Sequence, residues 1–178
     1  MMEERWEYRV WTEPDAMAAA IRRELKEKDA DYRTDTYLLT GGGRDLIKLR
    51  GGETLEVKQL LAADGTLEYW GMAWRQNFPM DLPSELAGHD LTAENEAELR
   101  RAVSAAGIPM IDVRKHRRRY EADGACLEVT AVIAEESRHD TLGIEAPELD
   151  VAKELASRFG FDRYPNVHYG AFLRSLFD

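Results

Sequence analysis

The sequence lacks several features that mark special classes of protein. It has one cysteine, Cys126, among 178 residues, so it can form no internal disulfide and offers no paired thiols for a metal. It has no long uncharged apolar run, which excludes a membrane-spanning helix. Its opening, MMEERWEYRV, is charged from the start, unlike a secretory signal. We therefore expect a cytoplasmic protein with no membrane partner, in which Cys126 is a small core residue.

Positive charge is also in deficit. The chain carries 24 Lys and Arg against 34 Asp and Glu, a formal net charge of −10. A chain of this charge does not attract nucleic acid or anionic lipid as a whole. Any basic site must therefore be local, and no nucleic-acid partner is expected.

The length and composition fit one compact domain over residues 1–178, with 44% hydrophobic and 33% charged residues. Thr12 and Pro14 are typical of a helix start, and Gly107 and Gly160 are typical of helix ends. Helices are predicted over residues 12–29, 92–107, 147–160 and 170–177. The last of these carries apolar residues that suit either a lid over one end of a barrel or contact with a second subunit in a homodimer. Of the two, the lid is favoured.

Between the helices the pattern alternates with a period of two, which indicates strands. Strands are predicted over residues 5–10, 33–39, 45–50, 54–61, 66–74, 110–120, 125–132 and 141–147. Short Gly- and Asp-containing turns join several of them as hairpins, and residues 77–90 are predicted to be the main loop. The expected fold is therefore α+β: an eight-stranded, mainly antiparallel β-barrel with helices packed outside.

The polar faces of these strands are rich in long cations. Lys48 and Arg50 alternate with apolar residues, and Lys115, Arg117 and Arg119 share one face of strand 110–120. A flat sheet with a solvated face is one explanation, and a patch that binds nucleic acid is another. In a closed barrel, the same faces would line the lumen. Such a lumen is costly unless an anion occupies it, and phosphate oxygens suit both guanidinium and ammonium groups.

Several short motifs occur in a recognisable order: RWEYR, DTY at 35–37, LIKLR followed by LEVK, VRKHRRRY, and GIEAPE followed by a helix. In this order the chain resembles the CYTH domains of the triphosphate tunnel metalloenzyme superfamily over nearly its whole length. That superfamily includes thiamine triphosphatases, inorganic tripolyphosphatases and a class of adenylate cyclases. The resemblance implies a basic tunnel that holds inorganic tripolyphosphate or an organic triphosphate.

The resemblance also implies which cations contact the phosphates. The family's opening E-x-E-x-K reads Arg5-Trp6-Glu7-Tyr8-Arg9 here, so the first Glu is replaced by Arg. The substrate-binding residues that match the family pattern are Arg9, Lys48, Arg50, Lys58, Lys115 and Arg117. Arg75 and Arg119 are expected to add to them. Arg5 and Glu7 are the expected catalytic residues, with Arg5 neutralising charge that develops in the reaction.

Family members hold one or two divalent ions on acidic side chains, which implies Mg²⁺ or Mn²⁺ as cofactor. The ligands expected here are Glu7, Glu56, Glu128 and Glu145. Gly143 and Thr130 stand where the family has acidic residues, so the ion should bind less tightly. Two functions stay open: metal-dependent hydrolysis of a triphosphate, or noncatalytic binding of polyphosphate.

Other conspicuous residues are expected to lie outside the site. The histidines His89, His116, His139 and His168 lack the paired spacing of a zinc site. Trp70 and Trp74 are two of the four tryptophans and lie in one predicted strand. We expect both to face the helix layer as core.

Overall fold

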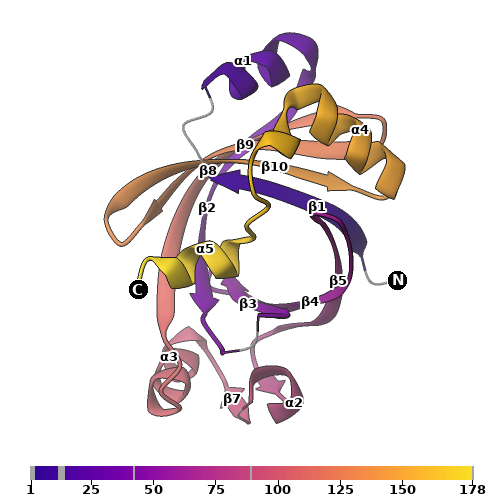
Figure 1. The fold of residues 1–178 in the computed structure, drawn as a ribbon. Helices are drawn as coiled ribbons and strands as arrows, with labels where there is room; N and C mark the ends of the chain where they lie inside the picture. Colours follow the sequence, from indigo (N-terminus) through magenta and orange to yellow (C-terminus); the bar gives the residue numbers. More distant parts are fainter. Residues whose placement is uncertain (1–2, 12–14, 42, 89, 178) are drawn as a thin grey trace.

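The structure is a computed structural model that describes residues 3–11, 15–41, 43–88 and 90–177. Eight antiparallel strands close into a barrel in the order β1-β10-β9-β8-β2-β3-β4-β5 (Figure 1). The strands are β1 (Glu4–Trp11), β2 (Lys26–Leu38), β3 (Asp45–Arg50), β4 (Thr54–Asp64), β5 (Leu67–Asn77), β8 (Met110–Ala122), β9 (Ala125–Ala134) and β10 (Ser137–Ala146). The predicted α+β class and the eight-stranded barrel are confirmed.

The remaining elements surround the barrel. The helices are α1 (Asp15–Glu24), α2 (Ser84–Ala87), α3 (Glu96–Ala105), α4 (Leu149–Phe159), the 3₁₀ turn η1 (Phe161–Arg163) and α5 (Tyr169–Ser175). A two-stranded sheet pairs β6 (Met80–Leu82) with β7 (Leu91–Ala93). Among the described residues, no helix is long and apolar enough to cross a membrane.

Several predicted boundaries differ from the structure, and the strands predicted over 33–39 and 141–147 begin earlier, at Lys26 and Ser137. The first helix ends at Glu24, because the chain from Lys26 onward pairs with the end of β8. The second begins at Glu96, where the Asn95 side chain caps it by accepting a hydrogen bond from the Glu98 amide. The segment predicted as a loop contains β6 and α2. Thr12, Pro14 and His89 lie outside the described residues.

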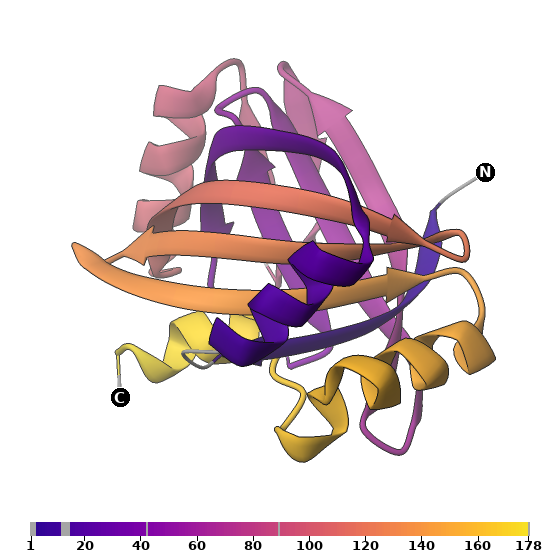
Figure 2. The ribbon, with the colours of Figure 1, turned by 90° about the horizontal axis from the view of Figure 1, so that it is seen from above.

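Apolar side chains on the outer face of the barrel are covered by helices in two places. Over β1, β8, β9 and β10, α1 and α4 bury a cluster that includes Tyr8, Leu127 and Leu155 (Figure 2). Over β3 and β4, α3 and the small sheet bury a second cluster that includes Leu55 and Leu99. Because each strand sends alternate residues to opposite faces, burying the apolar face outward turns the polar face into the lumen.

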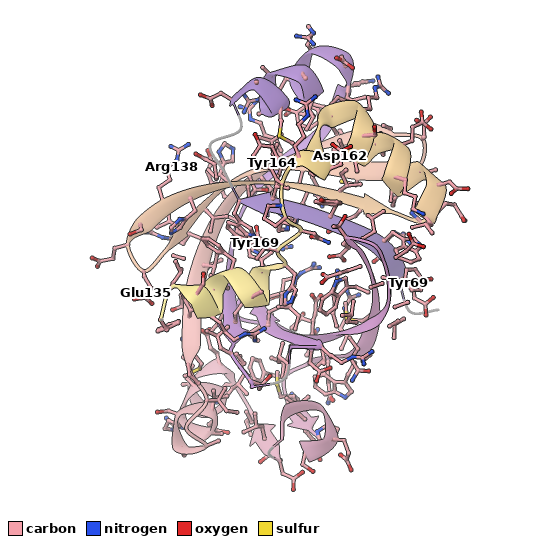
Figure 3. All side chains as sticks on the ribbon, in the orientation of Figure 1. Tyr69, Glu135, Arg138, Asp162, Tyr164 and Tyr169 are labelled. Carbon is pink, nitrogen blue, oxygen red and sulfur yellow. The ribbon has the colours of Figure 1, made fainter. Side chains whose placement is uncertain are left out.

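The C-terminal helix α5 packs into one end of the barrel. Tyr169 and Leu173 are buried with Tyr37, Ile111 and other residues from the inner wall, and Figure 3 shows Tyr169 at the start of this helix. The Trp11 ring stacks on Phe172 at 3.6 Å between centroids, which fixes the helix against β1. The prediction that the tail covers one end of the barrel agrees with this placement. We call this the covered end.

A β-bulge overturns the expectation for one of the two tryptophans. The register between β4 and β5 shifts between Val57 and Lys58, and again between Leu60 and Ala62. Trp74 packs with the helix-side cluster as predicted, but Trp70 faces the lumen. An extra residue in one strand reverses the face of every residue beyond it, so simple alternation fails there.

Candidate functional site

The barrel encloses a cavity of about 400 Å³ that is lined mainly by charged side chains. All nine cations predicted for the site reach it, together with Lys28 and Arg33, which the sequence reasoning missed. These eleven cations face eight acidic side chains in a protein whose overall charge is −10. The predicted cations lining the cavity are Arg5, Arg9, Lys48, Arg50, Lys58, Arg75, Lys115, Arg117 and Arg119.

Near the covered end, Lys115 is buried with two partners from β2. Its ammonium donates hydrogen bonds to Asp35 Oδ2 at 2.8 Å and to the Tyr37 hydroxyl at 2.7 Å. It also lies 4.0 Å from the centroid of the Tyr169 ring. Burial holds the pKa of Lys115 well below its usual value, although Asp35 opposes the shift. This ammonium would gain from a further anion nearby, because its own carboxylate partner only partly offsets its desolvation.

A second buried cation, Lys48, lies on the facing wall. Its ammonium is 3.5 Å from Glu56, which also forms ion pairs with Arg75 at 3.0 Å and with Arg50 at 3.3 Å. Burial lowers the pKa of Lys48 to about 8. Glu56 therefore forms ion pairs with three cations, which already neutralise its negative charge and disfavour binding of a metal ion.

Glu128 is shared by two arginines. It accepts a hydrogen bond from Arg9 Nη2 at 2.8 Å and one from Arg117 Nη1 at 3.2 Å, and all three side chains are less than 10% exposed. Burial by itself would raise the pKa of this carboxyl. The two guanidinium groups outweigh burial and hold the pKa below its usual range.

Three acidic side chains line the lumen on adjacent strands. Glu7 of β1 is directly opposite Glu145 of β10 on one side and Glu68 of β5 on the other. Lys58 donates to Glu7 at 2.6 Å, and the Trp70 indole donates to Glu68 at 3.0 Å. Burial raises the pKa of Glu145, an effect that Lys58 opposes and the neighbouring Glu7 increases.

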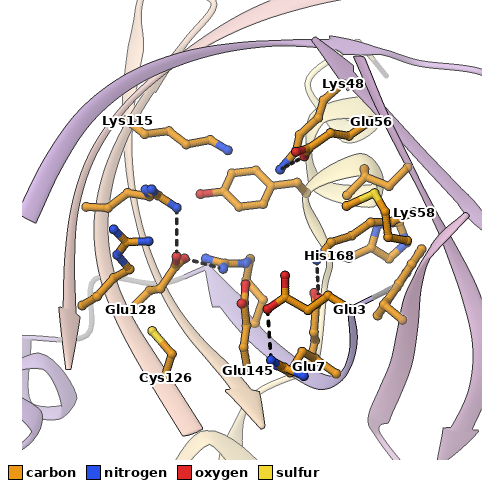
Figure 4. Close-up of a pocket in the computed structure, with 18 of the residues that line it drawn as sticks. Glu3, Glu7, Lys48, Glu56, Lys58, Lys115, Cys126, Glu128, Glu145 and His168 are labelled. Atoms are coloured by element: carbon orange, nitrogen blue, oxygen red, sulfur yellow. Dashed lines mark hydrogen bonds and ion pairs between the residues drawn. The ribbon is translucent and has the colours of Figure 1, made fainter. Parts of the chain in front are cut away.

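The four predicted metal ligands do not converge on one point. Figure 4 shows Glu56 beside Lys48 on one wall, while Glu7 and Glu145 lie together on the opposite wall. In the part of the chain that the structure describes, no three His, Cys, Asp or Glu side chains gather closely enough to hold a metal ion. Three of the four carboxylates are already neutralised by Lys or Arg. The residues present therefore do not fit a preformed divalent-metal site, and ligation by these glutamates stays a prediction.

The predicted catalytic Arg5 lies at the end of the barrel opposite α5. Its guanidinium pairs with Glu3 at 3.0 Å, and its side chain is 36% exposed. Arg75 and Arg119, with side chains 47% and 32% exposed, lie on strand segments at this same end. We call it the open end.

Several lining residues were not anticipated. Glu68 and Trp70 were not predicted, because the bulge reverses the face of the strand that carries them. Arg33 was not predicted, because a single Arg on an acidic strand forms no recognisable pattern. His168 lines the cavity, contrary to expectation, while its Nδ1 accepts a hydrogen bond from the Ala171 amide. Cys126 also lines the cavity instead of packing in the core, and burial raises the pKa of its thiol to about 12.

Comparison with known proteins shows similarity at the level of structure alone. No family model matches the chain, and no curated protein matches it. A conserved protein of Pyrococcus furiosus superposes with a TM-score of 0.59 at 16% identity, covering 94% of this chain and 98% of the other. A putative adenylate cyclase of Bacillus halodurans superposes at 0.56 with 13% identity and 99% coverage of both chains.

A third neighbour is a putative adenylyl cyclase of Hippeastrum with a dominant triphosphatase activity. It superposes with a TM-score of 0.56 at 13% identity and covers 96% of this chain and 95% of its own. These neighbours confirm that the chain has the triphosphate tunnel fold that its motifs predicted. At such low identity, the likeness extends to the fold alone.

Proposed function

We propose that the tunnel binds the triphosphate group of a small molecule, either inorganic tripolyphosphate or an organic triphosphate. The observation that carries this proposal is the group of buried cations in the lumen: Arg9, Lys48, Lys115 and Arg117 are each at most 8% exposed. Each of them pairs with a carboxylate, but the cavity is lined by eleven cations against eight acidic side chains. A buried excess of positive charge is disfavoured, and an anion that enters the cavity relieves that cost. A chain of phosphates is long enough to contact cations on several strands at once.

Hydrolysis of the bound triphosphate is the second candidate. It is favoured by Glu145, which lines the cavity and has no cation partner among the ion pairs of the described residues. Its raised pKa makes this carboxylate a better proton acceptor than an ordinary glutamate, so it suits a general base for an attacking water. The triphosphatase activity of the Hippeastrum neighbour supports the same reaction class. Dependence on Mg²⁺ or Mn²⁺ and assembly into a homodimer stay predictions.

Binding is tested by calorimetric titration of tripolyphosphate into the wild type and two variants. Arg117→Met removes a lumen cation, whereas Arg118→Met removes the adjacent arginine of β8, whose side chain is 47% exposed and pairs with Glu27. We expect Arg117→Met to weaken binding by about a hundredfold, and Arg118→Met to leave it unchanged. Equal loss in both variants would show that the lumen is not the site.

Hydrolysis is tested by phosphate release from tripolyphosphate, thiamine triphosphate and ATP, with Mg²⁺, with Mn²⁺ and with chelator. If Glu145 is the base, Glu145→Gln should bind tripolyphosphate at least as tightly as the wild type but release phosphate about a hundredfold more slowly. Binding with no release under any condition would favour a noncatalytic binding protein.

A further inference from the structure

The buried carboxylate of Glu128, on the β9 wall of the lumen, pairs with two cations of the protein itself. Glu128 uses one oxygen for Arg9, at 2.8 Å, and the other for Arg117, at 3.2 Å. Because all three side chains are buried, water screens these contacts very little. A divalent ion could reach Glu128 only by displacing a buried guanidinium.

A glycine on the neighbouring strand makes room for this arrangement. Gly143 lies opposite Glu128 across β9 and β10, and opposite Arg9 across β1 and β10. A Cβ atom at this position would lie 2.5 Å from Arg9 Nη2 and 2.9 Å from Arg9 Cζ, closer than real contacts allow. The backbone at Gly143 is not left-handed, so the glycine matters for the space that the Arg9 guanidinium occupies and not for backbone conformation. The Arg9 guanidinium therefore rests directly on the backbone of β10.

The other acidic side chains do not compensate. Glu7 is held by Lys58 at 2.6 Å, and Glu56 is surrounded by three cations. Only Glu145, of the predicted ligands, has no ion pair in the described part of the chain. Glu68, beside Glu7, also has no ion pair among the described residues, but it accepts a hydrogen bond from the Trp70 indole. A hard divalent cation needs several oxygen ligands at once, and no three acidic side chains of the described residues gather closely enough to provide them.

We propose that the tunnel binds polyphosphate as the free anion, without a divalent ion. Arg9, seated on Gly143, supplies the positive charge beside Glu128. This inference rests on the proposed function and specifies the form of its ligand. Mg²⁺ in solution then competes with the protein's cations for the same phosphate oxygens. Added Mg²⁺ should weaken binding instead of supporting it.

The first experiment needs no variant. Tripolyphosphate is titrated calorimetrically into the wild-type protein in chelator and in excess Mg²⁺, at one pH and one ionic strength. We expect the affinity in chelator to exceed that in Mg²⁺ by about tenfold. Weaker binding in chelator would overturn the inference and leave the proposed function standing. Absence of binding in both solutions would overturn both.

A pair of glycine variants tests the role assigned to Arg9. Gly143→Ala should push the guanidinium away from Glu128 and weaken binding in chelator by about tenfold. Gly41→Ala is the matched control, because a Cβ there meets nothing within 4 Å and the backbone is not left-handed. Unchanged affinity in a folded Gly143→Ala protein would overturn the role of Arg9. If that variant does not fold, the wild-type comparison still decides whether the ligand is metal-free.

Discussion

The two ends of the tunnel hold the same kinds of side chain in very different surroundings. At the covered end, Lys115 is 4% exposed and depends on Asp35, Tyr37 and Tyr169. At the open end, the Arg75 side chain is 47% exposed, and its partner Glu56 is buried but also pairs with Lys48 and Arg50. Burial therefore decides how much each cation matters, because an exposed ion pair is screened by water and a buried one is not. The covered end should dominate both stability and binding.

The largest expected effect is on stability at the covered end. Lys115→Met removes a partner of Asp35, which is fully buried and, among the described residues, would keep only Arg33 as an ion-pair partner. We expect the free energy of unfolding to fall by about 3 kcal/mol, measured by urea denaturation. Arg75→Met should change it by less than about 1 kcal/mol. Equal losses would remove the proposed difference between the two ends.

Lys48 provides a pH-dependent test of how burial affects a lumen cation, because burial lowers its pKa to about 8. Below pH 8 the Lys48 side chain is a cation and attracts phosphate. Above pH 8 this side chain loses its proton and its charge, so the attraction is lost. Relative to Lys48→Arg, which stays charged, wild-type affinity for tripolyphosphate should fall about tenfold between pH 7 and pH 9. Comparing the two proteins cancels the titration of the ligand itself. A constant ratio would mean that Lys48 does not contact the anion.

Tyr169 provides a smaller test at the covered end. Its hydroxyl is buried without a hydrogen-bond partner in the described structure, while its ring contacts Arg9 and Lys115. We expect Tyr169→Phe to weaken tripolyphosphate binding about fivefold, because the hydroxyl is then missing as a donor to phosphate. The melting temperature should stay level or rise, since an unpaired buried group is removed. Unchanged affinity with altered stability would make Tyr169 a packing residue only.

The smallest effect is expected at the open end. Arg119→Met removes an arginine whose side chain is 32% exposed and pairs with Asp29 of β2. Tripolyphosphate affinity should fall by about threefold at low salt and by less at high salt, because exposed charges are screened. Titrations at two ionic strengths check this. A salt-independent loss would place Arg119 among the buried contacts.

Much of the site could be predicted because it depends on a local rule. Alternation along a strand predicts which residues share a face. It places Lys48 with Arg50, and Lys115 with Arg117 and Arg119, and all five line the cavity. The rule failed at Trp70 and Glu68, where a bulge reverses the face of the strand. The ion pairs were also beyond prediction, because Arg9 and Glu128 are 119 residues apart and meet only through the register of β1, β10 and β9.

The barrel strands, their apolar outer face and their cationic inner face follow from the sequence alone, because a strand's period of two is a property of neighbouring residues. Tertiary structure alone decided which carboxylates are neutralised, that Gly143 leaves space for Arg9, and which lumen cations are buried and which exposed. Those features follow from closure of the barrel, where strand register and the packing of α5 set the distance between charges and their access to water.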